Sequence, residues 1–254
     1  MPDSTIFALG GTCGDAQPDS HLERSLSSFS AGNTWSALRG DASTSGDSED
    51  NSSGTEDTGV HNLEDTGRGT TNTRQIDRSF FAFDLSGESS TVASADLKIK
   101  TDNLGDTDTN SSTVYVVAAT DLSSNTGDFG NVFSSGTTLG TLFGSTTIST
   151  TQQYHTWTLN SDAISRINTL IGSGWIFKIG LMGYYDYNNS APGSNELKIQ
   201  VLYANQIGTS SDPKLELTFS AAGFGHKTIG VASANIGKVK GVATANVGKV
   251  IGVD

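Results

Sequence analysis

The chain has 254 residues, 34% of them hydrophobic, and carries a formal net charge of −12 from 15 Lys and Arg against 27 Asp and Glu. This charge disfavours a nucleic-acid partner, because phosphate binding needs a cationic surface. Thirty glycines and a shortage of strong helix formers indicate an all-β protein rather than a helical bundle. No apolar run approaches the roughly 18 residues of a membrane span, so we expect no membrane insertion.

Short alternating or apolar runs, bounded by Gly, Asn, Asp and Ser, predict about nine strands. In one of them, Leu97 and Ile99 alternate with Lys98 and Lys100, which is typical of an antiparallel strand with one solvated face. The predicted strands are Thr5–Leu9, Trp35–Arg39, Arg78–Leu85, Ala95–Lys100, Thr113–Ala119, Tyr154–Leu159, Trp175–Leu181, Leu197–Tyr203 and Lys214–Phe219.

One short helix is predicted between a cap at Ser161 or Asp162 and a stop at Gly172. One face of it carries Ile164, Ile167 and Ile171. Short as it is, this helix is expected to close one end of a sandwich. The fold expected for residues 1–220 is therefore a jelly-roll-like antiparallel β-sandwich with one short helix.

Two regions depart from this pattern. Residues 41–73 are rich in Asp, Glu, Ser, Thr and Gly, and predict an acidic surface loop or a set of loops. Residues 221–254 form a C-terminal tail, in which IGVASANIGKV is followed by KGVATANVGKV and IGVD with a period of eleven. Short strands suit these residues better than a helix, because glycine and valine are costly in helices.

So short a repeat cannot bury its own apolar side chains, because small repeats depend on stacked neighbours. We therefore expect the tail to mediate assembly with another copy or another protein. The side chains expected to do so are Ile229, Val231, Ile236, Val239, Val242, Val247, Val250 and Ile251.

A family resemblance is carried by the run Arg78-Ser-Phe-Phe-Ala-Phe-Asp84 and by the following segment, Val92 to Ile99. These residues resemble the DNRLRE-type jelly-roll domains. The segments 161–171, 175–180 and 212–217 resemble the closing half of that family, so the resemblance covers about residues 5–220. It implies a β-sandwich used in surface adhesion, carbohydrate association or virion decoration, with no enzymatic activity.

The tail resembles the Gly-Val-Ala-x-Ala-Asn-Ile-Gly-Lys-Val repeats at the ends of bacteriophage structural proteins. Together the two resemblances imply a non-enzymatic virion protein, in a capsid decoration, a head fibre, or a tail fibre or spike. Its expected partners are other virion proteins and further copies of itself, with a trimer favoured by analogy with virions. Its expected location is the virion, extracellular after release. The alternative is a carbohydrate-binding module or adhesin whose partner is a cell-surface glycan.

Asp106, Asp108 and Asn110 have a spacing that can gather oxygen ligands around calcium. The remainder of an EF-hand loop is missing, because Ser111 replaces its glycine and Val117 its glutamate. A solvated turn between two strands is the simpler interpretation, since Asp and Asn favour turns unaided. We expect no other metal or cofactor.

Tyr184, Tyr185 and Tyr187 lie in a predicted polar loop with Asp186 and two asparagines. Flat rings beside amide and carboxylate groups could form a carbohydrate-binding face. Tyrosines are also enriched at subunit interfaces, and an exposed or interfacial loop is the favoured interpretation.

Arg74 and Arg78 could bind an anion, but ion pairing with the acidic residues 41–73 is the favoured interpretation. The four histidines are scattered, and none has a metal-ligand spacing. With no nucleophile elbow or phosphate-binding loop either, the sequence predicts a protein that is not an enzyme.

Overall fold

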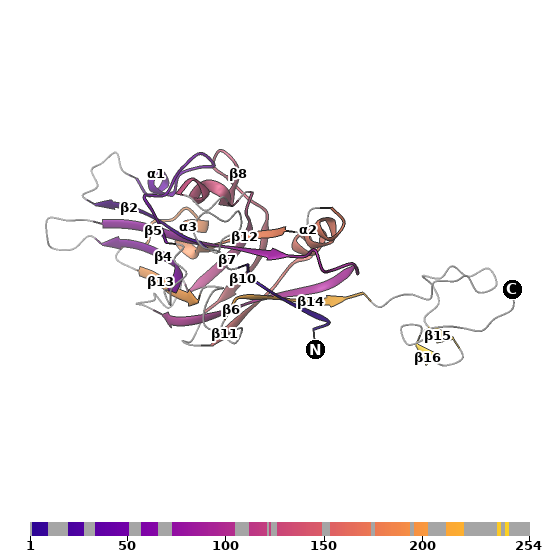
Figure 1. Ribbon diagram of the computed structural model, residues 1–254. Helices are drawn as coiled ribbons and strands as arrows, with labels where there is room; N and C mark the ends of the chain where they lie inside the picture. The colour runs from indigo at the N-terminus through magenta and orange to yellow at the C-terminus, as the bar shows by residue number, and fades with distance from the viewer. Residues whose placement is uncertain are drawn as a thin grey trace. The chain divides into compact units, whose positions relative to one another are not determined.

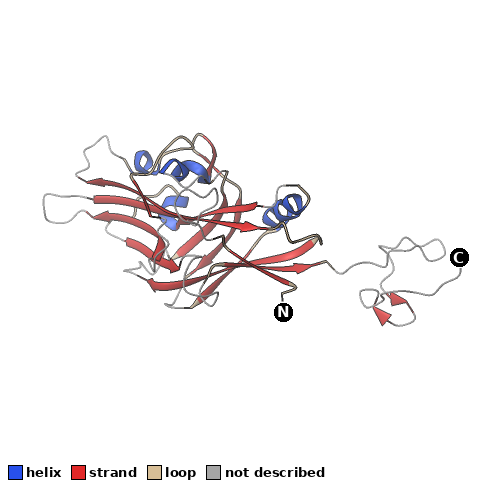
Figure 2. Ribbon diagram, in the orientation of Figure 1, coloured by secondary structure: helices blue, strands red, loops and turns tan. Residues whose placement is uncertain are grey.

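The computed structural model of the chain describes residues 2–9, 20–27, 34–50, 57–65, 73–104, 112–120, 122, 126–148, 153–173, 176–193, 196–202, 212–220, 238–239 and 242–243. The chain divides into two units, Met1–Thr218 and Phe219–Asp254. The first unit is built from antiparallel sheets that pack on one another (Figure 1, Figure 2), which confirms the predicted all-β sandwich. None of the helices in the described residues is both long enough and apolar enough to span a membrane.

The strands follow the chain in short, turn-separated pieces, as the glycine and asparagine content leads one to expect. They are β1 (Ser4–Phe7), β2 (Ser20–Ser27), β3 (Ser48–Asp50), β4 (Asp57–Asp65), β5 (Thr73–Asp84), β6 (Val92–Leu104), β7 (Thr113–Ala118), β8 (Phe133–Ser135), β9 (Thr138–Leu139), β10 (Leu142–Thr147), β11 (Tyr154–Thr158), β12 (Ile176–Gly183), β13 (Glu196–Leu202) and β14 (Lys214–Phe219). The helices are α1 (Trp35–Arg39), the 3-10 helix η1 (Thr126–Val132), α2 (Ser161–Ile171) and α3 (Tyr184–Tyr187).

Twelve of the described strands form one hydrogen-bonded sheet, and nine of them follow one path in the order β1-β14-β6-β13-β4-β5-β12-β7-β10. β11 joins this path at β6, β2 joins it at β5, and β3 pairs with β2. The path folds over on itself, so that strands from its two halves face each other across a core. Trp157 of β11 bridges the halves, because its ring is fully buried and its Nε1 donates a 3.0 Å hydrogen bond to the Val114 carbonyl of β7.

β5 is the central strand of the body, and it is covered on both faces. Phe81 and Phe83 point to one face and Phe80 to the other, and all three are completely buried. An alternating strand with aromatic side chains on both faces predicts this double cover, and the prediction is confirmed.

One edge of β5 pairs with two different strands along its length. The point where the partner changes is where the buried charged residues of the body lie. Residues 73–77 pair with β4, whereas residues 79–84 pair with β12, and both of these strands lie opposite β2. β4 and β12 therefore diverge beside Arg78, leaving a fork at that point.

The helix α2 closes one end of the sandwich, as expected. Asn160 caps it by accepting from the backbone N–H groups of residues 162 and 163, and Gly172 follows its last turn. The Asn168 amide exchanges two hydrogen bonds with the backbone of Val92, the first residue of β6. Ala163, Ile167 and Leu170 form its buried face, so the predicted face is right at Ile167.

The predicted strand Trp35–Arg39 is wrong, because these residues form α1. Thr34 caps this helix by accepting from the backbone N–H of Ala37 at 3.2 Å. Trp35 and Leu38 are buried three residues apart, which is the spacing of a helix face rather than of a strand. With η1 and α3 also present, the expectation of a single helix is wrong too.

The prediction that residues 41–73 are a surface loop is wrong over β4. β4 lies inside the sheet, paired with β13 on one side and β5 on the other. Its side chains at Val60 and Asn62 are fully buried. The hydrophobic pattern fails here because one of the two buried positions carries an amide.

The second unit contains a short antiparallel pair, β15 (Lys238–Val239) and β16 (Val242–Ala243). Val239 lies opposite Val242, across the junction of the two eleven-residue repeats. Short strands therefore occur in the tail, as its composition favours. The other proposed assembly residues of the tail lie outside the described residues.

The core assignment can be tested with a matched pair of phenylalanines. Phe83→Ala removes a fully buried ring from β5 and is expected to lower the free energy of unfolding by roughly 3–5 kcal/mol. Phe7→Ala removes the same ring from a site that is 36% exposed and should cost far less. Urea melts measure both losses, and equal losses would show that the inward face of β5 is misassigned.

Candidate functional site

The predicted tyrosine loop is the helical turn α3, and it fills the fork between β4 and β12. The backbone N–H of Asp186 donates a 3.1 Å hydrogen bond to the buried Asn62 side chain of β4. From the other side, the indole Nε1 of Trp35 in α1 donates to the Tyr185 carbonyl at 3.4 Å. α3 is therefore fixed by side chains from two distant segments.

A buried ion pair joins this turn to the centre of β5. Arg78 Nε lies 2.7 Å from Asp186 Oδ2 and Nη2 lies 2.8 Å from Oδ1, and both side chains are completely buried. Two parallel N–H bonds to one carboxylate form the bidentate geometry that makes such pairs strong and directional. The pair therefore sets both the position and the orientation of α3.

Both Nη nitrogens of Arg78 also donate to backbone carbonyls. Nη1 donates to the Phe129 carbonyl of η1 at 2.7 Å, and Nη2 donates to the Arg39 carbonyl of α1 at 3.0 Å. The guanidinium lies 4.0 Å from the centre of the Phe129 ring and 5.2 Å from that of Phe133. One side chain thus holds α1, η1 and α3 together.

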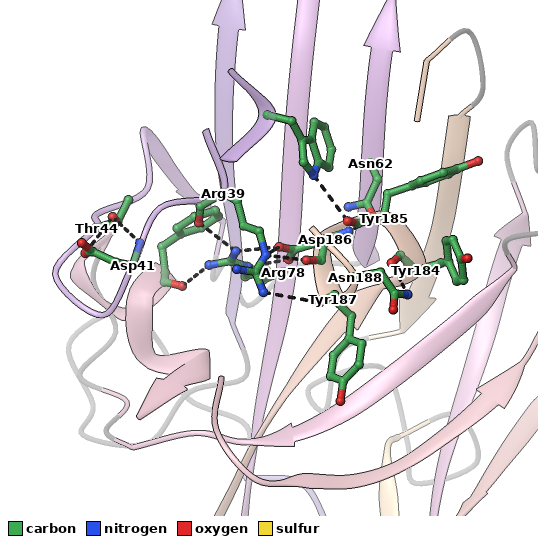
Figure 3. A network of polar contacts seen from close by, with 12 residues as sticks. Arg39, Asp41, Thr44, Asn62, Arg78, Tyr184, Tyr185, Asp186, Tyr187 and Asn188 are labelled. Carbon is green, nitrogen blue, oxygen red and sulfur yellow. Dashed lines mark hydrogen bonds and ion pairs between the residues drawn. The ribbon is translucent and has the colours of Figure 1, made fainter. Parts of the chain in front are cut away.

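A second arginine approaches the same carboxylate (Figure 3). Arg39 Nε donates to the Asp186 backbone carbonyl at 2.5 Å and lies 3.4 Å from its Oδ1. Burial lowers the pKa of Arg39 below its ordinary value; the charge of Asp186 opposes this effect, and Arg78 adds to it. Asp186 therefore compensates the charge of two buried guanidinium groups.

Two glycines allow α1 and η1 to approach Arg78. Gly40 ends α1 at φ 73°, a conformation that other residues rarely adopt. A Cβ on Gly130 of η1 would lie 2.7 Å from the Asp41 carbonyl oxygen. Side chains at either position would push apart the segments that supply the Arg39 and Phe129 carbonyls.

The bonds of this cluster stabilise the fold. Both oxygens of Asp186 and the Nε and both Nη nitrogens of Arg78 are bonded inside the body. A catalytic carboxylate or an anion-binding arginine needs a free oxygen or N–H directed at the ligand. Here those atoms hold loops together.

The predicted ligand-binding tyrosines take part in the same packing. Tyr185 is only 7% exposed, so its assignment to an exposed or interfacial loop is wrong. Tyr187 is half-buried and stacks on Tyr115 of β7, with ring centres 3.9 Å apart and planes within 6°. Tyr184 is half-buried and meets Tyr185 edge to face. Each ring has an internal aromatic partner.

The expected ion pairing with residues 41–73 needs a similar correction at Arg78, whereas at Arg74, which lies opposite Glu64 of β4, it stays a prediction. Arg78 pairs with Asp186, which is 108 residues away, and not with residues 41–73. An arginine between the buried residues Ile76 and Phe80 signals a buried guanidinium that needs a carboxylate. The sequence could have indicated that Arg78 needs a carboxylate partner, but it could not have indicated which carboxylate.

A second charged cluster lies on the outer strands β14 and β6. Glu216 lies 2.7 Å from Lys98 and 3.3 Å from Lys214. Burial raises the pKa of Glu216, but the bonds and charges of the two lysines outweigh it, so the net pKa is lowered. Two residues before β14, burial raises the pKa of Asp212, whose Oδ1 has no hydrogen-bond partner among the described residues.

The proposed calcium ligands Asp106, Asp108 and Asn110 lie outside the described residues. Within the described ranges, no group of three His, Cys, Asp or Glu side chains is arranged to hold a metal ion. No protein-family model matches the chain, and no curated protein is significantly similar to it.

The dependence of the fork on Asp186 predicts an order of stability losses. Asp186→Asn leaves two buried guanidinium groups without their carboxylate, and should lower the free energy of unfolding by about 3–5 kcal/mol. Arg39→Met removes a charge but keeps the pair with Arg78, and should cost about 1–3 kcal/mol. Chemical denaturation measures both. A smaller loss for Asp186→Asn than for Arg39→Met would contradict the central role of the carboxylate.

Asp212, just before β14, and Glu216 within it predict opposite effects of pH on stability. The raised pKa of Asp212 means that its ionisation destabilises the folded chain as the pH rises through the ordinary value near 3.8. Asp212→Asn should therefore be more stable than the wild type at pH 7, with the difference vanishing in acid.

Glu216→Gln is the matched control, because its lowered pKa gives stability above the ordinary value near 4.5 that is lost in acid. This variant should be less stable than the wild type at pH 7 and should converge with it as the pH falls. Urea melts between pH 3 and 8 follow both, and changes of the same sign at pH 7 would contradict the assignment.

Proposed function

We propose that this protein is a non-enzymatic structural component of a bacteriophage virion, with a β-sandwich body and a C-terminal tail that mediates assembly. The observation that carries the proposal is the division of the chain after Thr218, which makes the repeat tail a unit separate from the body. The tail has its own short strand pair and an unusually regular apolar repeat.

The tail repeat supports an assembly role on physical grounds. Its valines and isoleucines recur every eleven residues, and two and a fraction copies are too few to form an independent core. Apolar area that one chain cannot bury is buried by association, which is the main driving force of obligate interfaces. A second copy or a neighbouring virion protein would supply the missing surface.

The chemistry of the body supports a structural rather than a catalytic role. Its fully buried charged side chains, Arg78 and Asp186, form hydrogen bonds with other groups inside the body. A body tied together in this way suits a component that must keep its shape within a particle. The resemblances of the body and tail segments to virion decoration domains and phage repeats favour the same role.

Removal of residues 221–254 tests the tail. The truncated chain should remain a folded, soluble sandwich but should lose its multimeric state and its attachment to particles. Light scattering after size-exclusion chromatography measures the mass, and co-sedimentation with particles measures attachment.

The matched control is a full-length chain whose tail has the same composition in scrambled order. Scrambling keeps charge and length but destroys the eleven-residue period, so it should abolish assembly as the deletion does. A second variant, Val239→Thr with Val242→Thr, changes the pair that face each other in β15 and β16 and should weaken it. Unchanged assembly in the deletion would sink the proposal.

A further inference from the structure

The described strands of the tail form a tight hairpin. β15 and β16 (Figure 1) are antiparallel, with Lys238 opposite Ala243 and Val239 opposite Val242. Only two residues, Lys240 and Gly241, separate the strands in the sequence. A connection of two residues that includes a glycine is typical of the tightest β-hairpins. With two residues in each strand, this hairpin is marginally stable by itself, so it needs a further surface to pack on.

The register gives the hairpin two unlike faces. Successive residues of a strand lie on opposite faces, and residues directly opposite each other in a strand pair share a face. Val239 and Val242 therefore lie on one face, which we call the valine face. Lys238 and Ala243 lie on the other, which we call the lysine face.

The residue pattern of this hairpin occurs three times in the tail. Lysine, a β-branched residue, any residue, glycine, valine, and alanine or aspartate follow one another in residues 227–232, 238–243 and 249–254. Each copy begins eleven residues after the one before it, and the structure describes the strands of the middle copy. The positions that correspond to its valine face are Thr228, Val231, Val239, Val242, Val250 and Val253.

Charge separates the two kinds of partner that the tail could have. Residues 221–254 carry four lysines and one acid, whereas residues 1–220 carry 11 basic and 26 acidic residues. A partner attracted by charge would be acidic and would bind the lysine face. The valine face has no charged position in any of the three copies, so it needs an apolar partner with the same eleven-residue spacing. The tail of another copy of this chain has both properties.

We propose that the valine faces of tails from separate copies of this chain pack on one another, so that the tail's partner is a second copy. Three contacts at equal spacing would form together, because each contact raises the effective concentration for the next. The lysine faces would then point to water. This inference rests on the assembly role proposed for the tail, and it names the partner that the role leaves open between another copy and another virion protein.

The purified full-length chain tests the inference in the absence of any other protein. Light scattering after size-exclusion chromatography is expected to give a multiple of the monomer mass. Added salt should preserve or strengthen the association, because it screens repulsion between the lysines of neighbouring tails. A monomer would overturn the inference. If deletion of residues 221–254 still abolished attachment to particles, the assembly role would stand with a different protein as partner. Association that weakens with salt would also overturn it, because the lysine face would then be the contact.

Matched substitutions on the two faces locate the contact. The triple variant Val231→Thr, Val242→Thr and Val253→Thr keeps β-branched residues but adds hydroxyl groups to the valine face, and should weaken association at least about tenfold. The triple variant Lys227→Gln, Lys238→Gln and Lys249→Gln changes the lysine face and should keep the multimer. All six positions lie in the second unit, so the body is expected to fold normally in both variants. An unchanged multimer in the valine variant, or its loss in the lysine variant, would overturn the inference.

Discussion

The bidentate ion pair between Arg78 and Asp186 is the interaction on which the rest of the body depends. It lies where β5 exchanges β4 for β12 along one edge, which is the point where the sheet divides. Burying a guanidinium costs several kcal/mol unless its donors are satisfied, and here they are satisfied by α1, η1 and α3. Because the buried guanidinium of Arg78 needs hydrogen-bond acceptors, it holds together three segments that are far apart in the sequence.

Different interactions stabilise the two ends of the body, the end around Arg78 and the end around α2. Around Arg78, charge-assisted bonds and aromatic rings stabilise turns that have little hydrophobic area of their own. Around α2, an apolar helix face and the paired amide bonds of Asn168 to the start of β6 do the same work. At the first end, the charged groups of Arg78 and Asp186 are engaged in internal bonds.

This separation suits a component of an assembled particle. A body that is rigid at its centre can present a tail without altering its core.

The sequence by itself determined the elements whose pattern is local. The period-two strands β6 and β14 and the capped helix α2 are recognisable because each buries one regular face, and β5 because its aromatic residues lie on both faces. Tertiary structure decided the rest. α1 is too short for its period to be distinguished from alternation, and β4 buries Asn62 because the Asp186 N–H, 124 residues away, satisfies it. The partner of Arg78 is likewise set by the fork, so long-range satisfaction of buried polar groups, which no local pattern encodes, decided the centre of this protein.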